Sequence, residues 1–124
     1  MGEVIFDRKD QLDRVVASLL PNEIVEAVFD LKNVGTGFLG ITSKRIIFYD
    51  DSFLRRTKAV VSIPYNRIAV IAAEDTDNNI FAGRGFFASS KLMLVTSHGE
   101  HEFEFRGADK AHTAHNLILS HMVG

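Results

Sequence analysis

The chain has 124 residues, which suits one domain; 46% of them are apolar and 24% are charged. This balance is typical of a globular protein and not of a disordered or membrane-spanning one. Because there is no cysteine, disulfides, thiolate catalysis and cysteine-bound zinc are excluded, and the net charge of −2 argues against a general nucleic-acid binder. The 10 Phe residues, beside 2 Tyr and no Trp, predict a Phe-rich core with some Phe left over.

The first element is expected to be a helix over residues 7–20. Its apolar residues at helical spacing, which should form one stripe, are Leu12, Val15, Val16 and Leu19. Pro21 disfavours helical backbone at the residue before it, so the helix should end at Leu20. The acidic, apolar-poor N-terminus does not resemble a signal peptide, and a cytoplasmic location is expected.

From residue 21 onward, the spacing of apolar residues changes from helical to alternating, which predicts strands. The seven expected strands cover residues 24–31, 38–42, 45–49, 60–63, 68–73, 92–96 and 101–106. In the first strand, the residues expected to share one apolar face are Val25, Ala27, Phe29 and Leu31. Most connections are turns without helices, so neighbouring strands should pair antiparallel.

A second helix is expected over residues 108–122. The residues on its apolar side are Ala108, Ala111, His115, Ile118 and Met122. Leu117 falls outside this stripe and indicates a second contact surface. The sequence therefore predicts a mainly β fold with flanking helices: a seven-stranded antiparallel barrel or sandwich, capped by the C-terminal helix and preceded by an N-terminal helix.

Three short motifs accompany this order of elements. Residues 20–23 read LPNE, residues 41–48 read ITSKRIIF and residues 62–68 read SIPYNRI. Together they resemble motifs of bacterial pleckstrin-homology-like (PH-like) domains and related GRAM-type domains, with Asn22 at a position where glycine is commoner. The resemblance spans about residues 20–122. Two local expectations follow: Pro64 should end an edge-type strand, and Tyr65 should bury its ring with its hydroxyl in water.

The resemblance implies a single PH-like domain over residues 1–124. Residues 1–20 would form an N-terminal helical extension, and residues 21–124 would form the PH-like core. It also implies a family without an assigned activity whose members tend to form ring-like homo-oligomers.

Residues 35–40 match GxGxxG by letter, but a dinucleotide site needs this loop to open a helix. Here the loop precedes an expected strand, and no acidic residue follows at the required distance. We therefore expect a flexible first hairpin, with close backbone approach at Gly40.

Residues 44–67 hold six basic and two acidic residues, a local charge of +4. The candidate contacts with an anionic surface are Phe53, Leu54, Arg55, Arg56 and Lys58. At about 1 kcal/mol for each basic residue, such a contact with anionic lipid would be weak and salt-sensitive. Only Lys32 lies between Leu31 and Gly40, which argues against specific phosphoinositide recognition. The alternative is an ordinary solvated loop or a subunit contact.

Residues 78–91 form a long connection rich in Gly and Phe, and such connections are often functional. The candidate residues of an oligomer or partner surface are Ile80, Phe81, Phe86 and Phe87 in this connection, together with Leu117. The alternative is that the connection folds back onto the barrel rim.

No residue pattern predicts catalysis, a metal or a cofactor. His112 and His115 diverge around the second helix, the paired acids fall in turns or on exposed strand faces, and no nucleophile motif is present. The sequence predicts a non-catalytic PH-like binding or scaffold module that self-associates and presents a protein-interaction surface. The alternative is a peripheral membrane protein that contacts anionic lipid head groups through residues 52–58.

Overall fold

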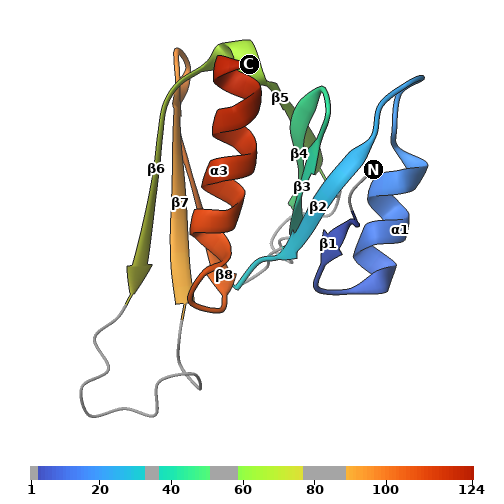
Figure 1. The fold of residues 1–124 in the computed structure, drawn as a ribbon, viewed down its shortest axis with the longest axis horizontal. Helices are drawn as coiled ribbons and strands as arrows, with labels where there is room; N and C mark the ends of the chain where they lie inside the picture. Colours follow the sequence, from blue (N-terminus) through green and yellow to red (C-terminus); the bar gives the residue numbers. More distant parts are fainter. Residues whose placement is uncertain (1–2, 33–36, 51–58, 77–88) are drawn as a thin grey trace. The chain divides into compact units, whose positions relative to one another are not determined.

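A computed structural model describes residues 3–32, 37–50, 59–76 and 89–124, which belong to two compact units, Met1–Tyr65 and Asn66–Gly124 (Figure 1). The N-terminal unit contains β1 (Ile5–Phe6), α1 (Lys9–Ala17), β2 (Val25–Asp30), β3 (Phe38–Thr42), β4 (Arg45–Asp50) and β5 (Ala59–Pro64). A short 3-10 helix, η1 (Tyr65–Arg67), follows β5. The C-terminal unit contains β6 (Ile68–Thr76), β7 (Ser89–Thr96), β8 (Gly99–Arg106) and α3 (Lys110–Val123).

The described strands form two separate sheets, not one closed barrel. The first has the order β1-β2-β3-β4-β5 and the second the order β6-β7-β8. All seven predicted strands are present as β2 to β8, and every pairing among them is antiparallel. The prediction left a barrel and a sandwich open. The described strands form two sheets, so the closed barrel is corrected, because alternation reveals strands but not which strand edges meet. The expectation of a single domain over residues 1–124 stays a prediction.

The strand β1 is an addition that the sequence pattern did not indicate, because it has only two residues and pairs parallel with β2. Asp7, which follows it, donates its N–H to the carbonyl of Val28 at 3.2 Å and accepts the N–H of Asp30 at 2.9 Å. Because these bonds hold Asp7 beside β2, α1 begins at Lys9 and not at the predicted residue 7.

The apolar face of β2 differs from the prediction. The register of β2 against β3 shifts between Val25 and Ala27, which indicates a β-bulge. A bulge reverses the alternation of side chains, so Val25 and Val28 lie in one core cluster although they are three residues apart. Ala27 and Phe29 are also buried, so β2 is apolar on both faces.

Helix α1 packs on this sheet where the chain has a glycine. A Cβ at Gly40 would lie 3.0 Å from Cγ2 of Ile47 and 3.2 Å from Cγ2 of Val15, so the predicted close approach at Gly40 is confirmed. Leu12 and Leu19 pack against the same cluster, but Val16 is exposed, which corrects its place in the predicted stripe.

The C-terminal unit consists of the three-stranded sheet and α3, which packs against it (Figure 1). The helix buries Ala111, Ala114 and Ile118. Ala108 precedes the helix and is exposed, while His115 and Met122 are only half-buried, so the predicted stripe is shifted toward Ala114. Ser90 ties the strand β7 to the helix, because its hydroxyl donates to the carbonyl of Gly107 and accepts the N–H of Ala111. No described helix is long and apolar enough to cross a membrane.

Candidate functional site

The three sequence motifs meet at one polar cluster in the N-terminal unit. The LPNE segment supplies Glu23, the turn between β3 and β4 supplies Thr42 and Arg45, and the end of β5 with η1 supplies Ser62 and Tyr65. We call these five residues the polar junction.

An ion pair between Glu23 and Arg45 forms the centre of the polar junction. Arg45 Nε donates to Glu23 Oε2 at 3.0 Å and Arg45 Nη2 donates to Glu23 Oε1 at 3.2 Å, so two donors of one guanidinium bind both carboxylate oxygens. The Glu23 side chain is 0% exposed and that of Arg45 is 15% exposed. A buried pair of this kind requires that its remaining hydrogen-bonding positions are also filled.

The surrounding residues fill those positions. Thr42 Oγ1 donates to Glu23 Oε2 at 2.5 Å and accepts the N–H groups of Lys44 and Arg45, each at 3.1 Å. Arg45 also donates to the carbonyl of Ser18 at 2.9 Å and to Ser62 Oγ at 2.8 Å. The polar junction therefore links the end of α1 to β3, β4 and β5.

Tyr65 closes the polar junction from η1. Its hydroxyl donates to the carbonyl of Thr42 at 2.5 Å, and the residue is buried. The expectation that the Tyr65 hydroxyl is solvated is therefore wrong. This hydroxyl, and not water, binds the carbonyl of Thr42 at the end of β3. The expectation for Pro64 is confirmed, because it is the last residue of β5, an edge of the first sheet.

The conformation of the LPNE turn suits the asparagine at its third position. Asn22 has a φ of 66°, in the left-handed region that glycine and asparagine adopt most easily. The turn is closed by the N–H of Glu23, which donates to the carbonyl of Leu20 at 3.0 Å. The N–H of Leu20 in turn donates to Glu23 Oε1 at 2.7 Å, so the turn aims the carboxylate at Arg45.

Two pKa shifts reflect this environment. Burial pushes the pKa of Glu23 upward, but the hydrogen bonds from Arg45, Leu20 and Thr42 and the charge of Arg45 outweigh it, and the pKa lies below its usual value. Burial raises the pKa of the Tyr65 hydroxyl far above its usual value, and the carboxylate of Glu26 acts in the same direction. Glu23 is thus ionised and Tyr65 protonated at neutral pH.

The polar junction is a structural centre and not a binding site. Both carboxylate oxygens, the Thr42 hydroxyl and three guanidinium nitrogens already have protein partners. Sequence reasoning located the motifs but missed this pairing. The signal that could have found it is the presence of an acid, a threonine and an arginine within otherwise apolar motifs.

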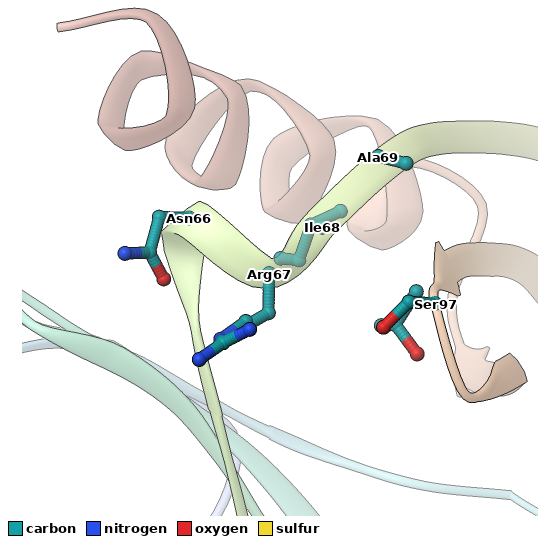
Figure 2. A pocket seen from close by; sticks show the side chains of 6 residues that line it. Asn66, Arg67, Ile68, Ala69 and Ser97 are labelled. Atoms are coloured by element: carbon teal, nitrogen blue, oxygen red, sulfur yellow. The ribbon is translucent and has the colours of Figure 1, made fainter.

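A different feature, an open hollow of about 300 Å³, lies in the C-terminal unit (Figure 2). Its lining residues are Asn66, Arg67, Ile68, Ala69, Thr96 and Ser97. Figure 2 shows that Asn66 and Arg67 come from the corner before β6, and Ser97 from the turn between β7 and β8. The lining has one cation and no acid, and no side-chain hydrogen bond or ion pair joins Arg67 to another described residue. Arg67 is therefore the one charged side chain at the hollow.

Most of the sequence-predicted contact residues lie outside the described part of the chain. This holds for the oligomer-surface residues Ile80, Phe81, Phe86 and Phe87 and for the lipid-contact residues Phe53, Leu54, Arg55, Arg56 and Lys58. Leu117 is described and lies half-buried on α3. The described residues bring no three His, Asp or Glu side chains together in a way that could hold a metal ion.

The edge strands carry exposed apolar side chains that the sequence pattern did not single out. On β1, Ile5 is 44% and Phe6 is 43% exposed; on β5, Val60 is 53% exposed; on β6, Val70 is 52% exposed. Each of these strands lies at the edge of a sheet in the described strand order. Edge strands have unpaired backbone groups, and natural proteins usually protect them with charge or coverage.

The model of the bacterial PH domain family matches residues 19–119. The chain belongs to this family. It is 29% identical over 105 residues to the uncharacterized protein YozO of Bacillus subtilis (strain 168), and the match covers 85% of this chain and 83% of YozO.

Two solved structures share the PH-like fold. A pleckstrin-homology domain from Shewanella amazonensis SB2B has a TM-score of 0.65 and 21% identity, with 95% of this chain and 100% of that one covered. A DUF1696 family protein with a pleckstrin-homology domain, from Shewanella loihica PV-4, has a TM-score of 0.65 and 19% identity, with 98% and 99% covered. The resemblance proposed from the three motifs is therefore confirmed.

Proposed function

We propose that this bacterial PH domain is a non-catalytic binding module that self-associates and presents a protein-interaction surface. Membership of the family supports a binding or scaffold role at a coarse level. The observation that carries self-association is the apolar character of the edge strands, where Ile5, Phe6, Val60 and Val70 are exposed.

An exposed apolar edge favours association for two reasons. Another strand can satisfy the unpaired N–H and C=O groups, and the exposed side chains leave water on contact. The edge strand β8 has Glu100, Glu102, Glu104 and Arg106 at alternate positions, which protects it from pairing. β1, β5 and the first six residues of β6 have no charged residue.

Light scattering coupled to size-exclusion chromatography tests this proposal. Over a roughly hundredfold range of protein concentration, the weight-average mass should rise above that of one chain, as mass action requires for a self-associating protein. A mass equal to one chain at every concentration would contradict self-association. Absorbance measured at each concentration serves as a control. It excludes non-specific aggregation as the cause of a rise in the weight-average mass.

The basic block at residues 44–67 supports a second candidate function, contact with anionic lipid. The polar junction reduces the charge available for it, because Arg45 is paired with Glu23 and nearly buried. Among the five other basic residues of the block, the candidate contacts are Arg55, Arg56 and Lys58. Flotation with phosphatidylserine vesicles at low salt should recover the protein, and replacing these three residues by alanine should abolish recovery. Absence of binding, or binding unaffected by the triple replacement, rejects this candidate.

A further inference from the structure

We propose that the outer face of the sheet β6-β7-β8 binds a basic amphipathic helix of another protein. The inference rests on the proposed function, because it names the partner of the protein-interaction surface. The outer face is the side of the sheet opposite α3 (Figure 1). Three features of this face lead to the choice of partner: its apolar surface, its glutamates and the spacing of these glutamates.

Alternation along β7 separates the two faces of the sheet. Ser90 lies on the inner face, because its hydroxyl accepts the N–H of Ala111 at the start of α3. Leu92 and Leu94 share this face and are fully buried. The residues between them point away from α3, together with their partners on β6 and β8. The outer face thus has three rows: Val70, Val95 and Glu100; Ala72, Met93 and Glu102; and Glu74, Lys91 and Glu104.

The outer face has an apolar part on β6 and β7. Val70 is 52% exposed, Ala72 is also exposed, and Met93 and Val95 are half-buried. In the register of the two strands, Val70 lies directly opposite Val95, and Ala72 lies directly opposite Met93. Because α3 packs on the other side of the sheet, these four side chains form an apolar surface that a partner can cover.

A column of glutamates on β8 borders this apolar surface. Glu100 and Glu102 are exposed, and neither has a side-chain hydrogen bond or ion pair with another described residue. Glu104 continues the column, with Lys91 opposite both it and Glu74 in the register. The face therefore has four glutamates against one lysine, and the glutamates repel one another. A cationic partner relieves this repulsion, while nucleic acid or anionic lipid would add to it.

The spacing of the glutamates matches that of side chains on a helix. Alternate residues of a strand are about 6.6–6.8 Å apart, and residues four apart in a helix rise about 6 Å. Lys or Arg at every fourth position of a helix can therefore meet Glu100, Glu102 and Glu104 in turn. Because neighbouring strands are about 4.8 Å apart, a helix about 10 Å in diameter over β6 and β7 places one side beside β8. A helix with adjacent apolar and basic stripes thus fits both parts of the face.

A helix of another protein fits this face better than a second copy of the chain does. Neither described helix has Lys or Arg at four-residue spacing, since α1 has Lys9 and Arg14 and α3 has only Lys110. Lys9 is moreover paired with Asp13 at 3.0 Å, and the guanidinium of Arg14 lies 5.0 Å from the centroid of the Tyr49 ring. The described helices therefore do not supply the basic stripe, and the partner helix belongs to another protein.

Fluorescence anisotropy with a labelled helical peptide of about 18 residues, about as long as β8, tests the inference. The peptide has Lys at every fourth position beside a stripe of Leu. The protein should bind it saturably, and more weakly as the salt concentration rises. Glu100→Lys and Glu102→Lys should each raise the dissociation constant about tenfold, because a like-charge contact replaces an attractive one. Glu3→Lys, at an exposed position of the N-terminal unit, makes the same change in net charge and should alter the constant less than about twofold.

Two further peptides separate the contribution of charge from that of apolar contact. A peptide with Glu in place of Lys should not bind the wild-type chain but should bind the double variant Glu100→Lys/Glu102→Lys. A peptide with Ser in place of Leu should bind at least about tenfold more weakly than the first peptide, because it buries less apolar surface. Both glutamates are exposed, and circular dichroism melting verifies that each variant folds.

The outcomes separate this inference from the proposed function. If the basic peptide does not bind, or if Glu3→Lys weakens binding as much as the β8 reversals do, the inference is wrong and self-association keeps its own test. If the β8 reversals abolish self-association as well, the face binds a second copy and the foreign partner is wrong. Weaker binding by both reversals, with no effect of Glu3→Lys, supports the inference. It does so even if the wild-type chain is monomeric, a result that would contradict only self-association.

Discussion

Glu23 is the residue through which separate segments of the N-terminal unit are joined. Its carboxylate accepts hydrogen bonds from the N–H of Leu20, the hydroxyl of Thr42 and the guanidinium of Arg45. Removing its charge would leave Arg45, only 15% exposed at its side chain, without a counter-charge. An unpaired charge at such a site costs more than the pair itself contributes.

Glu23→Gln should therefore lower the free energy of unfolding by roughly 2–4 kcal/mol. The amide keeps the size of the side chain but cannot accept bonds from Arg45 at both ends. Urea unfolding at neutral pH measures the effect. Glu102→Gln, at an exposed position on β8, is the control and should change stability by less than about 0.5 kcal/mol. A similar small change in Glu23→Gln would contradict a structural role for the ion pair.

The lowered pKa of Glu23 gives this effect a pH dependence. Because the folded-state pKa lies below the unfolded value of about 4.3, the ionised carboxylate stabilises the fold fully above that pH. The contribution is lost as the pH falls through the folded-state pKa. The stability difference between the wild-type chain and Glu23→Gln should thus be constant near neutrality and shrink in acid. A difference that grows on acidification would contradict the assigned direction.

The sequence motifs contain the residues of the polar junction but do not show that these residues contact one another. Family-like motifs drew attention to residues 20–23, 41–48 and 62–68, yet Glu23 and Arg45 are 22 positions apart. No local pattern predicts a contact over that separation, since it depends on which strands become neighbours. The positive φ of Asn22 is a local property and easier to anticipate, because asparagine tolerates the left-handed conformation.

At the level of elements, the packing of α1 on the first sheet depends on Gly40. A side chain there would meet Ile47 and Val15, at 3.0 and 3.2 Å for the Cβ alone. Gly40→Val should therefore lower the free energy of unfolding by roughly 1–3 kcal/mol, because it overpacks the contact between helix and strand. Urea unfolding measures the change.

A second substitution identifies the cause. If the clash with α1 is responsible, combining Gly40→Val with Val15→Ala should cost less than the sum of the two single changes. Val15→Ala alone is the control, and it should destabilise through the loss of buried methyl groups. If the losses of unfolding free energy are strictly additive, the contact with Val15 is not the reason why Gly40→Val destabilises the fold.

Most strands were predictable because alternation is a local property of the sequence. The strand β3 has the predicted bounds, and the others differ at their ends. The prediction of which β2 residues share one face was wrong, because a bulge reverses the alternation of side chains without changing the composition of the strand. The two-residue β1 has no periodicity to detect, and α1 is shorter than expected because Asp7 and the LPNE turn occupy its predicted ends.

For the whole molecule, the important property is which edges of the sheets are free to pair. The composition predicted an excess of Phe, and the loops that contain part of it lie outside the described residues. Four of the eight exposed large apolar residues among the described residues, Ile5, Phe6, Val60 and Val70, are on the edge strands β1, β5 and β6. Sequence alternation could not reveal this, because edge status depends on strand order.

Hydrogen exchange at two protein concentrations, one low and one roughly a hundredfold higher, tests self-association through the apolar sheet edges most directly. Amides on the outer edge of β1, β5 or β6 should exchange more slowly at the higher concentration, because a second copy covers or bonds them. Amides on the outer edge of the charged strand β8 should exchange equally at both concentrations. Unchanged exchange along all three apolar edges, or new protection on β8 instead, would contradict the account.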